Sequence, residues 1–355
     1  MHFLHVVGAR PNFMKVAPLT HALAARPGVR QTLVHTGQHY DQNMSDVFFR
    51  ELEIPEPDFN LAVGSGTHAE QTGQIMLRFE PVVVEQKPDW VLVYGDVNST
   101  IAAALVCAKL QIPVAHVEAG LRSFDRRMPE EINRVLTDQL ADLLFTPSAD
   151  GDQNLLREGV PRERIHFVGN VMIDTLVRLL PKTAATLPPE LPERYALVTL
   201  HRPSNVDDLS GLKSLLDALT AIGATLPIIF PVHPRTRQKI AELGFRHSSN
   251  LRLWEPQSYL QFLALQQKAT IVITDSGGIQ EETTFLGVPC LTLRDTTERP
   301  VTVTEGTNIM IGRDMNLLCR EVEAVLRGER KNGGIPPLWD GRAAERIAQI
   351  LEAKG

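Results

Sequence analysis

The sequence predicts an α/β protein built from two Rossmann-like, doubly wound domains that face a central cleft. Short β-branched runs alternate with longer amphipathic stretches along the whole chain, which is the pattern of βα units in a parallel sheet. At 355 residues the chain is longer than one hydrophobic core usually holds. A proline-rich stretch from residue 181 to residue 192 separates two series of such units. The chain therefore divides into two domains of ordinary size.

Each series is expected to contain six strands. The strands of the first series are expected at residues 3–7, 32–35, 90–94, 114–117, 143–146 and 165–168. Those of the second series are expected at residues 196–200, 228–232, 251–254, 269–273, 290–293 and 308–311. This spacing predicts an N-terminal domain over 1–181, a linker over 182–194 and a C-terminal domain over 195–340. A last helical segment, 341–355, adds no strand and could pack back on the first domain.

Composition narrows the range of functions. Hydrophobic residues at 43% and charged residues at 22% are typical of a globular protein. The net charge of -6 arises from 36 basic and 42 acidic residues without a basic run, which argues against nucleic-acid binding. Cys107, Cys290 and Cys319 are too far apart for a disulfide framework or zinc site, and a reducing cytoplasm fits them. No apolar run has membrane-spanning length, and residues 2–7 are too short for a signal peptide.

Residues 274–282 are the clearest candidate for a binding site. They follow an apolar strand and open a short helical segment that should end near Gly287. Gly277 and Gly278 permit close approach of a ligand to the backbone, and free N–H groups in a first helical turn attract phosphate. Glu282 lies four residues after Gly278, on the same helical face, where it could accept hydrogen bonds from a sugar hydroxyl. The alternative is an ordinary turn whose acidic residues complement the helix dipole.

Acidic and basic residues follow several predicted strands of the first domain. Ligands in doubly wound sheets bind beyond the carboxyl ends of the strands. Arg10 and Lys15 lie at the start of the first helix, where two cations could hold a diphosphate or remain surface charges. Asp96 and Glu118 end two apolar strands, where partial desolvation suits carboxylates to proton transfer. Both could instead be loop residues, and Asp96 could cap the helix that follows it.

Other polar residues in these positions carry weaker signals. Glu130 and Arg134 are four residues apart on a predicted helix, so an ion pair is the default and a site constellation the alternative. His201 and His233 close two strands of the second domain and could assist a leaving phosphate. His35 and His39 have a metal-like spacing, but the glycine between them argues against a shared helical face, so we predict no metal site.

One motif has a competing interpretation. Residues 64–69 fit the loose dinucleotide pattern GxGxxA. The strand that would precede the motif is short and follows two prolines, so a loop is the better interpretation. We therefore expect no nicotinamide cofactor.

Together these motifs resemble the non-hydrolysing UDP-N-acetylglucosamine 2-epimerases. The similarity runs from about residue 3 to about residue 315, nearly the whole chain. It is carried by Gly8-Ala9-Arg10-Pro11 with Lys15, Thr36-Gly37-Gln38-His39, Tyr94-Gly95-Asp96, the segments 116–122 and 129–134, Val168-Gly169-Asn170, His201-Arg202, Pro231-Val232-His233, and the segments 275–282 and 294–300. The last two segments match the family pattern most specifically in the identity and order of their residues.

The resemblance implies a GT-B-like fold, a homodimer, and reversible conversion of UDP-GlcNAc to UDP-ManNAc without added metal or nicotinamide. It also implies roles for individual residues. The catalytic group would be Asp96, Glu118, Glu130 and His201. The groups that bind the UDP-sugar would be Arg10, Lys15, Arg134, His233, Gln257, Phe262, Ser276, Gly277, Gly278, Glu282 and Arg299. Among these, Gln257 and Phe262 would line the uridine pocket, and Glu282 would bind the ribose. Glu281, next to Glu282, is expected to have a structural role.

The chemistry of the substrate explains such a group of residues. The C2 proton is not adjacent to a carbonyl, so its direct removal is unfavourable. Departure of UDP from C1 as C2 loses its proton would give a 2-acetamidoglucal, and UDP could add back after reprotonation on the opposite face. The site must then stabilise a leaving diphosphate and transfer protons on both faces of C2.

The chain departs from the family pattern in two places. Many members read His-Arg-Arg-Glu-Asn where this chain has His201-Arg202-Pro203-Ser204-Asn205, and the chain has Tyr40-Asp41 after Gln38-His39. In bacterial members these regions contribute to a second, activating UDP-GlcNAc site, so weak or altered activation is expected here. Three other functions stay open: a 2-epimerase of a modified UDP-sugar such as a UDP-diacetamido-uronic acid, a GT-B glycosyltransferase, and a nucleotide-sugar sensor without turnover.

Overall fold

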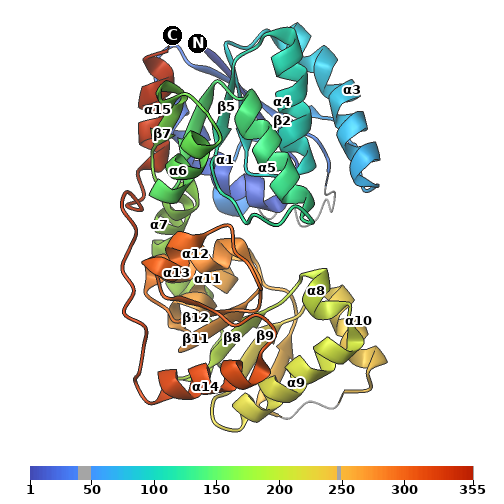
Figure 1. Cartoon of the computed structure of the whole chain (residues 1–355), viewed down its shortest axis with the longest axis vertical. Coiled ribbons are helices and arrows are strands. Elements are labelled where there is room, and N and C mark those ends of the chain that lie inside the picture. The colour runs from blue at the N-terminus through green and yellow to red at the C-terminus, as the bar shows by residue number, and fades with distance from the viewer. Residues whose placement is uncertain (39–48, 246–248, 355) are drawn as a thin grey trace. The chain divides into compact units, whose positions relative to one another are not determined.

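The computed structural model describes residues 1–38, 49–245 and 249–354, and it contains two parallel β-sheets with helices on both faces (Figure 1). Contacts divide the chain into two compact units. Unit 1 comprises Met1–Arg178 with Pro337–Gly355, and unit 2 comprises Leu179–Pro336. Each sheet is doubly wound, so the predicted fold class is confirmed.

The sheet of unit 1 has seven parallel strands in the order β3-β2-β1-β4-β5-β6-β7. The central strands β1, β4 and β5 are fully or almost fully buried, because helices cover both faces of a parallel sheet. The strands are β1 (His2–Val7), β2 (Arg30–His35), β3 (Phe59–Asn60), β4 (Trp90–Tyr94), β5 (Val114–Val117), β6 (Leu143–Thr146) and β7 (Ile165–Phe167).

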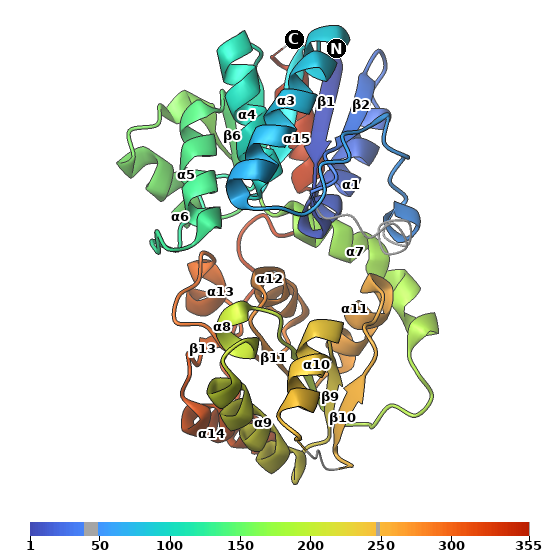
Figure 2. The same ribbon diagram turned by 90° about the vertical axis from the view of Figure 1, so that its right-hand side faces the viewer.

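The helices of unit 1 form two layers. In chain order they are α1 (Arg10–Ala24), α3 (His68–Gln86), α4 (Asn98–Leu110), α5 (Pro129–Leu140), α6 (Ala149–Arg157), the greater part of α7 (Val171–Thr183), and α15 (Ala343–Glu352). Helices α3, α4 and α5 pack side by side on one face, and α1 packs against α15 on the other (Figure 2). Thr67 and Glu70 form a capping box that starts α3. The GxGxxA segment is thus a loop and a helix start.

The C-terminal segment is fastened to unit 1 by specific hydrogen bonds. The buried Trp339 donates its indole N–H to the Pro147 carbonyl at 2.8 Å. Asp174 accepts hydrogen bonds from the Ala343 and Ala344 N–H groups at 3.1 and 2.7 Å, which satisfies two donors at the start of α15. Arg346 donates to the Val168 carbonyl at 3.0 Å.

Unit 2 has six parallel strands in the order β10-β9-β8-β11-β12-β13. They are β8 (Ala196–Thr199), β9 (Ile228–Pro231), β10 (Leu251–Trp254), β11 (Ile271–Thr274), β12 (Cys290–Thr292) and β13 (Asn308–Met310). The helices are α8 (Pro203–Val206), α9 (Leu209–Gly223), α10 (Pro234–Glu242), α11 (Tyr259–Lys268), α12 (Gly277–Leu286), α13 (Pro300–Thr304) and α14 (Met315–Leu326). Helix α12 ends as expected at Gly287, which has a left-handed φ of 69°.

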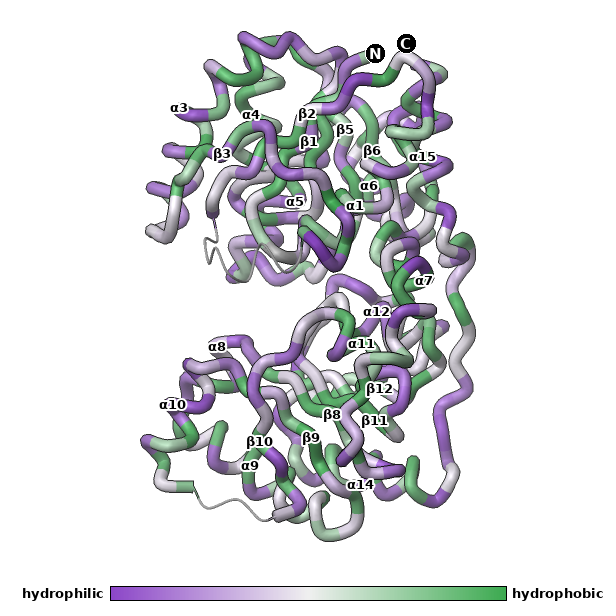
Figure 3. Tube along the Cα trace, turned by 180° about the vertical axis from the view of Figure 1, so that it is seen from behind, coloured by the Kyte–Doolittle hydropathy of each residue, from purple (hydrophilic) through white to green (hydrophobic). Residues whose placement is uncertain are grey.

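All twelve expected strands are present, and their ends differ from the expected ones by at most two residues. The two-residue strand β3 was not predicted, because so short an edge strand has no measurable periodicity. Hydrophobic residues concentrate along the strands (Figure 3), and buried apolar residues of the strands and helices form the core of each unit. In the described ranges, no helix is both long and apolar enough to cross a membrane.

Candidate active site

Two carboxylates extend from neighbouring strands of the unit 1 sheet. Asp96 lies two residues after β4 and Glu118 one residue after β5, and these strands pair in parallel with Tyr94 opposite Val117. The pairing places both residues at one edge of the sheet, as predicted from the strand ends. Glu118 is buried, whereas the Asp96 side chain is 24% exposed.

Glu118 forms a buried ion pair with Lys15, which is in the second turn of α1. The two side chains lie against Gly95, whose φ is 61°. A Cβ at this position would lie 2.6 Å from Lys15 Nζ and 3.1 Å from Glu118 Oε2, so a glycine is needed for both conformation and space. Glu118 itself has a φ of 75°, an uncommon value for a residue with a side chain.

Asp96 is joined to helix α5 through Arg134. The Arg134 guanidinium pairs with both Asp96 and Glu131. The alternative that Asp96 caps the next helix is wrong, because Val97 occupies the cap position of α4 without a side-chain cap. The default ion pair between Glu130 and Arg134 is also wrong. Arg134 instead pairs with Glu131, which lies three residues before it, while the Glu130 side chain is exposed.

Two residues that shape this region, Glu131 and Asn12, were not predicted from the sequence. Glu131 accepts hydrogen bonds from the Ser123 N–H and Oγ at 3.0 and 2.9 Å and from the Phe124 N–H at 2.8 Å, which fixes the loop before α5. Asn12 accepts from the Gly8 and Ala9 N–H groups at 3.0 and 3.1 Å and donates to the Tyr94 carbonyl at 2.9 Å. Buried polar side chains with several backbone partners of this kind have no sequence signature. Asn12 thereby fixes the loop that leads into Arg10, the first residue of α1.

In unit 2, Asp275 organises the ends of two strands. It is fully buried after β11 and accepts hydrogen bonds from the backbone N–H of His201 at 3.1 Å and of Arg202 at 2.9 Å. His201 Nδ1 lies 3.0 Å from its carboxylate, and the Asn205 amide donates at 3.0 Å. Burial alone would raise the pKa of Asp275, but the hydrogen bond and charge of His201, with Asn205 and the Arg202 N–H, hold it below the ordinary value. His201 is thus oriented by Asp275 while its ring is half exposed.

The start of helix α12 packs against a guanidinium. Ser276 is the residue before the first turn, and its N–H donates to Thr274 Oγ1 at 3.0 Å. A Cβ on Gly277 would lie 2.4 Å from an Arg299 terminal nitrogen, which shows how closely that side chain approaches the helix. Arg299 also pairs with Glu281 at 3.0 Å, which fits the structural role expected for Glu281. The half-buried Gly278 follows in the same turn. The Arg299 cation, which also pairs with Glu298, therefore lies beside the positive end of the helix dipole.

Glu282 is buried one turn further along α12. Tyr259 donates its hydroxyl hydrogen to Glu282 Oε1 at 2.8 Å. Burial raises the pKa of Glu282 to about 7, although the hydrogen bond from Tyr259 opposes the rise. The Glu282 side chain therefore accepts a hydrogen bond, and its protonation changes with pH near neutrality.

The remaining predicted residues of unit 2 have local structural contacts. Gln257 donates to the Glu255 carbonyl at 2.7 Å, and the half-buried Phe262 packs against a hydrophobic cluster of this unit. His233 is exposed and caps α10 by accepting from the Arg235 N–H at 3.3 Å. Their roles toward a nucleotide stay predictions.

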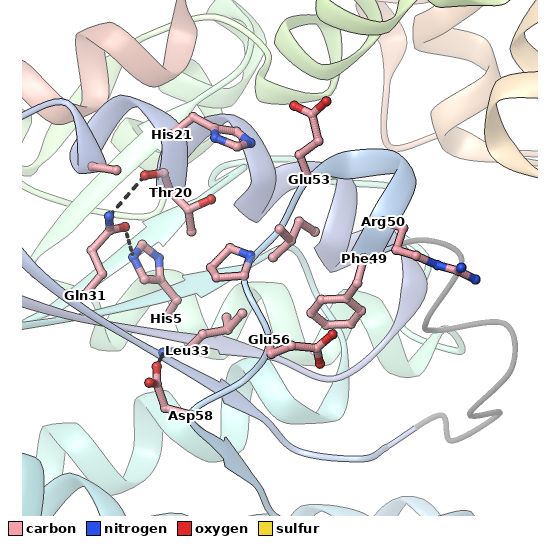
Figure 4. Close-up of a pocket in the computed structure, with 13 residues that line it drawn as sticks. His5, Thr20, His21, Gln31, Leu33, Phe49, Arg50, Glu53, Glu56 and Asp58 are labelled. Carbon is pink, nitrogen blue, oxygen red and sulfur yellow. Dashed lines mark hydrogen bonds between the residues drawn. The ribbon is translucent and has the colours of Figure 1, made fainter.

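A separate cavity of about 600 Å³ lies in unit 1 (Figure 4). It is bounded by the second half of α1, by β1 and β2, and by residues that follow position 48. In it His5 lies 2.9 Å from Gln31 Oε1, and the Gln31 amide donates to the Thr20 carbonyl at 3.1 Å. No predicted site residue among those that the structure describes lines this cavity, so the site at the strand ends is distinct from it.

Comparisons with known proteins agree with the geometry. The family model for UDP-N-acetylglucosamine 2-epimerase matches residues 21–352. The UDP-N-acetylglucosamine 2-epimerase of Methanocaldococcus jannaschii is 43% identical, over 98% of this chain and 97% of the relative. The UDP-2,3-diacetamido-2,3-dideoxy-D-glucuronate 2-epimerase of Pseudomonas aeruginosa is 41% identical, over 99% of both chains.

The crystal structure of the M. jannaschii UDP-GlcNAc 2-epimerase in complex with UDP-GlcNAc and UDP matches with a TM-score of 0.90 and 41% identity. The match covers 99% of this chain and 100% of that one. Similarity of this extent in both sequence and fold identifies the family. This chain belongs to the UDP-N-acetylglucosamine 2-epimerase family.

Proposed function

We propose that the protein catalyses the reversible epimerisation of UDP-GlcNAc to UDP-ManNAc at C2. The observation that carries the proposal is the pair of carboxylates, Asp96 and Glu118, at adjacent strand ends, each of them paired with a cation. Epimerisation requires a base and an acid on opposite faces of one carbon, and neighbouring strand ends supply two such groups. A nucleotide-sugar sensor has no need for such carboxylates, and a glycosyltransferase would need an acceptor and leave C2 untouched.

The proposed reaction is an elimination followed by an addition. A carboxylate removes the C2 proton as the bond between C1 and the diphosphate oxygen breaks, which gives UDP and 2-acetamidoglucal. A second group then delivers a proton to the opposite face of C2, and the UDP oxygen adds to C1. Asp96, Glu118 and Glu130 share the proton transfers, and His201, which Asp275 orients, assists the leaving diphosphate.

The nucleotide is proposed to bind to unit 2 through the start of α12. The free N–H groups of Gly277 and Gly278, the Ser276 hydroxyl and the Arg299 guanidinium are suited to the negative oxygens of a diphosphate. Glu282 is proposed to accept a hydrogen bond from the ribose, and Gln257 and Phe262 to contact the uracil. Arg10, Lys15, Arg134 and His233 complete the proposed set of substrate contacts.

A second candidate substrate is a UDP-diacetamido-uronic acid. The specific observation in its favour is the 41% identity to an epimerase named for that sugar, close to the 43% identity to one named for UDP-GlcNAc. The two candidates are separated by measuring kcat/KM for both sugars with the same enzyme preparation. We expect the larger value with UDP-GlcNAc. A larger value with the uronic acid would reassign the substrate while leaving the reaction type intact.

The role of Asp96 is tested with Asp96→Asn, which keeps the size of the side chain and removes its charge. We expect kcat to fall at least about 100-fold, since proton transfer contributes about 10²- to 10⁴-fold to the rate. UDP should still bind in calorimetry, because Asp96 is not among the residues proposed to hold the nucleotide. Full turnover by a folded Asp96→Asn protein would remove this residue from the mechanism.

We also propose that the protein forms a homodimer. The outer surfaces of α3 and α5 expose large apolar side chains, with Leu77 at 67%, Val84 at 51% and Leu136 at 48%. These two helices flank α4 on the same face of the sheet, and exposed apolar side chains on one face are typical of a surface that a partner covers. Light scattering should give twice the chain mass, and Leu77→Lys with Leu136→Lys should reduce it to the monomer. A monomeric wild-type protein would contradict the proposal.

The free cysteines fit a cytoplasmic enzyme.

A further inference from the structure

A buried histidine, His116, lies between the two proposed catalytic carboxylates in the sheet of unit 1. It is in β5, two residues before Glu118, and its side chain is fully buried. Its Nδ1 lies 2.6 Å from an Asp138 carboxylate oxygen, and its Nε2 lies 2.8 Å from the carbonyl oxygen of Gly95. Gly95 immediately precedes Asp96. The ring therefore connects helix α5 to the turn that carries the first carboxylate.

The partners determine the protonation of the ring. A backbone carbonyl only accepts hydrogen bonds, so Nε2 must carry a proton. Asp138 also accepts the Gly120 N–H at 3.1 Å and pairs with Arg122 at 2.7 Å, so its second oxygen faces two donors. One proton therefore lies between Nδ1 and the first Asp138 oxygen. Arg122 contributes a permanent positive charge beside this pair, and it also lies 2.6 Å from Glu158.

The same network fixes the backbone on both sides of Glu118. Asp138 holds the ring of residue 116 and the N–H of Gly120, which has a φ of 80° and whose carbonyl accepts from the Asn154 amide at 2.9 Å. Glu118, between these anchors, has the unfavourable φ of 75°. A non-glycine residue keeps such a conformation only where its surroundings over-determine it, at about 1–3 kcal/mol. Asp138 supplies that constraint from helix α5, and His116 supplies it from strand β5.

We propose that the hydrogen-bonded His116–Asp138 pair is a positioning device for the reaction, which aligns Asp96 through the Gly95 carbonyl and Glu118 through the turn at Gly120. The inference rests on the proposed function, because alignment matters only if these two carboxylates transfer protons. Neither residue of the pair touches the substrate in this account. Their substitution should therefore lower turnover more than it lowers substrate binding.

Two variants separate the two contacts of the ring. In His116→Asn the amide nitrogen takes about the position of Nδ1, so the bond to Asp138 is kept and the bond to Gly95 is lost. In His116→Gln the amide nitrogen takes about the position of Nε2, so the bond to Gly95 is kept. We expect His116→Asn to lower kcat about 10- to 100-fold, with KM changed less than about threefold, and His116→Gln to lower kcat less. Exchange of the C2 proton with solvent should fall in step with kcat.

A matched control is His2→Asn. His2 is also a buried histidine of this sheet, with Nε2 2.8 Å from Thr32 Oγ1, but it lies at the amino end of β1. This variant should keep the wild-type kcat. Wild-type kcat and exchange in folded His116→Asn would overturn the proposal, as would an equal loss in the His2→Asn control.

Nitrogen NMR of the wild-type protein with labelled histidine gives a readout that does not depend on activity. We expect Nε2 of His116 to carry a proton that is hydrogen-bonded to the Gly95 carbonyl, and the Nδ1 signal to change in Asp138→Asn. A wild-type ring whose Nε2 carries no proton would refute the contact with Gly95. Wild-type protein that fails to epimerise UDP-GlcNAc would instead refute the proposed function, and the NMR spectrum would still decide the state of the pair.

Discussion

Substitution of Gly95 by alanine is predicted to damage the site without introducing any new polar group. Gly95 has a φ of 61°, so any side chain there meets the left-handed penalty, about 1–2 kcal/mol. The added Cβ would also lie 2.6 Å from Lys15 Nζ and 3.1 Å from Glu118 Oε2. Real Cβ atoms do not approach a nitrogen so closely, so the Lys15 side chain must move.

The size of the effect follows from what that movement does. Lys15 is the ion-pair partner of Glu118, and both side chains are buried. Loss of one partner of a buried pair costs about 3–5 kcal/mol, and partial separation costs a fraction of that value. We therefore expect Gly95→Ala to lower the free energy of unfolding by about 2–5 kcal/mol. A shift of Glu118 by about 1 Å should lower kcat by about 100-fold.

The matched control is Gly159→Ala. Gly159 has a φ of 82° in the same unit, but a Cβ there meets no atom within 4 Å. This variant should lose only the conformational penalty of about 1–2 kcal/mol and keep the wild-type kcat. Stability is measured by urea denaturation and kcat by conversion of UDP-GlcNAc. Equal stability and equal activity of the two variants would refute the importance of the contact between Gly95 and the ion pair.

Three further predictions concern pH and the C-terminal helix. Glu282 has a folded-state pKa of about 7, above the ordinary 4.5, so its contribution to stability is present below pH 4.5 and lost as pH rises through about 7. The free energies of unfolding of wild type and Glu282→Gln, measured by denaturation against pH, should therefore diverge by about 3 kcal/mol across that window. A constant difference between the two proteins would contradict this. Burial lowers the pKa of His5 from 6.5 to about 4, so its contribution to stability is present above pH 6.5 and lost as pH falls to about 4. His5→Gln cannot be charged, so in the same assay its free energy of unfolding should fall by about 3 kcal/mol less than that of wild type over this pH range. Asp174→Asn should cost about 1–2 kcal/mol in denaturation and speed hydrogen exchange at the start of α15, because one of two backbone N–H groups loses its acceptor; unchanged exchange there would argue against the anchor.

The strands of both units could be predicted because they are buried on both faces. A parallel strand covered by helices on each side is a short apolar run, such as the one at β4, bounded by polar residues at the strand ends. The strand β3 escaped prediction since two residues at a sheet edge have no pattern. The positions of Asp96 and Glu118 followed from the same logic, because parallel strands place their carboxyl ends at one edge of the sheet.

The partners of the site residues could not be predicted. Lys15 and Glu118 are 103 positions apart, and their pairing depends on how α1 packs on the sheet. The choice of Glu131 over Glu130 as the partner of Arg134 depends on which face of α5 is buried, and two consecutive acids give no signal for that choice. His116 and Asp138 are similar cases. Each residue is ordinary by itself, and its significance arises from the Gly95 carbonyl and the turn at Gly120.

The proposed proton transfer at C2 is tested most directly by incubating the protein with UDP-GlcNAc in D2O, without any acceptor, and following the sugar protons by NMR. We predict that UDP-ManNAc appears with deuterium at C2, and that the recovered UDP-GlcNAc also gains deuterium there as the reaction approaches equilibrium. UDP-ManNAc that keeps its original C2 proton would contradict an elimination through 2-acetamidoglucal with solvent-exchanging carboxylates. UDP-GlcNAc that stays unchanged would contradict the assignment of this sugar as the substrate.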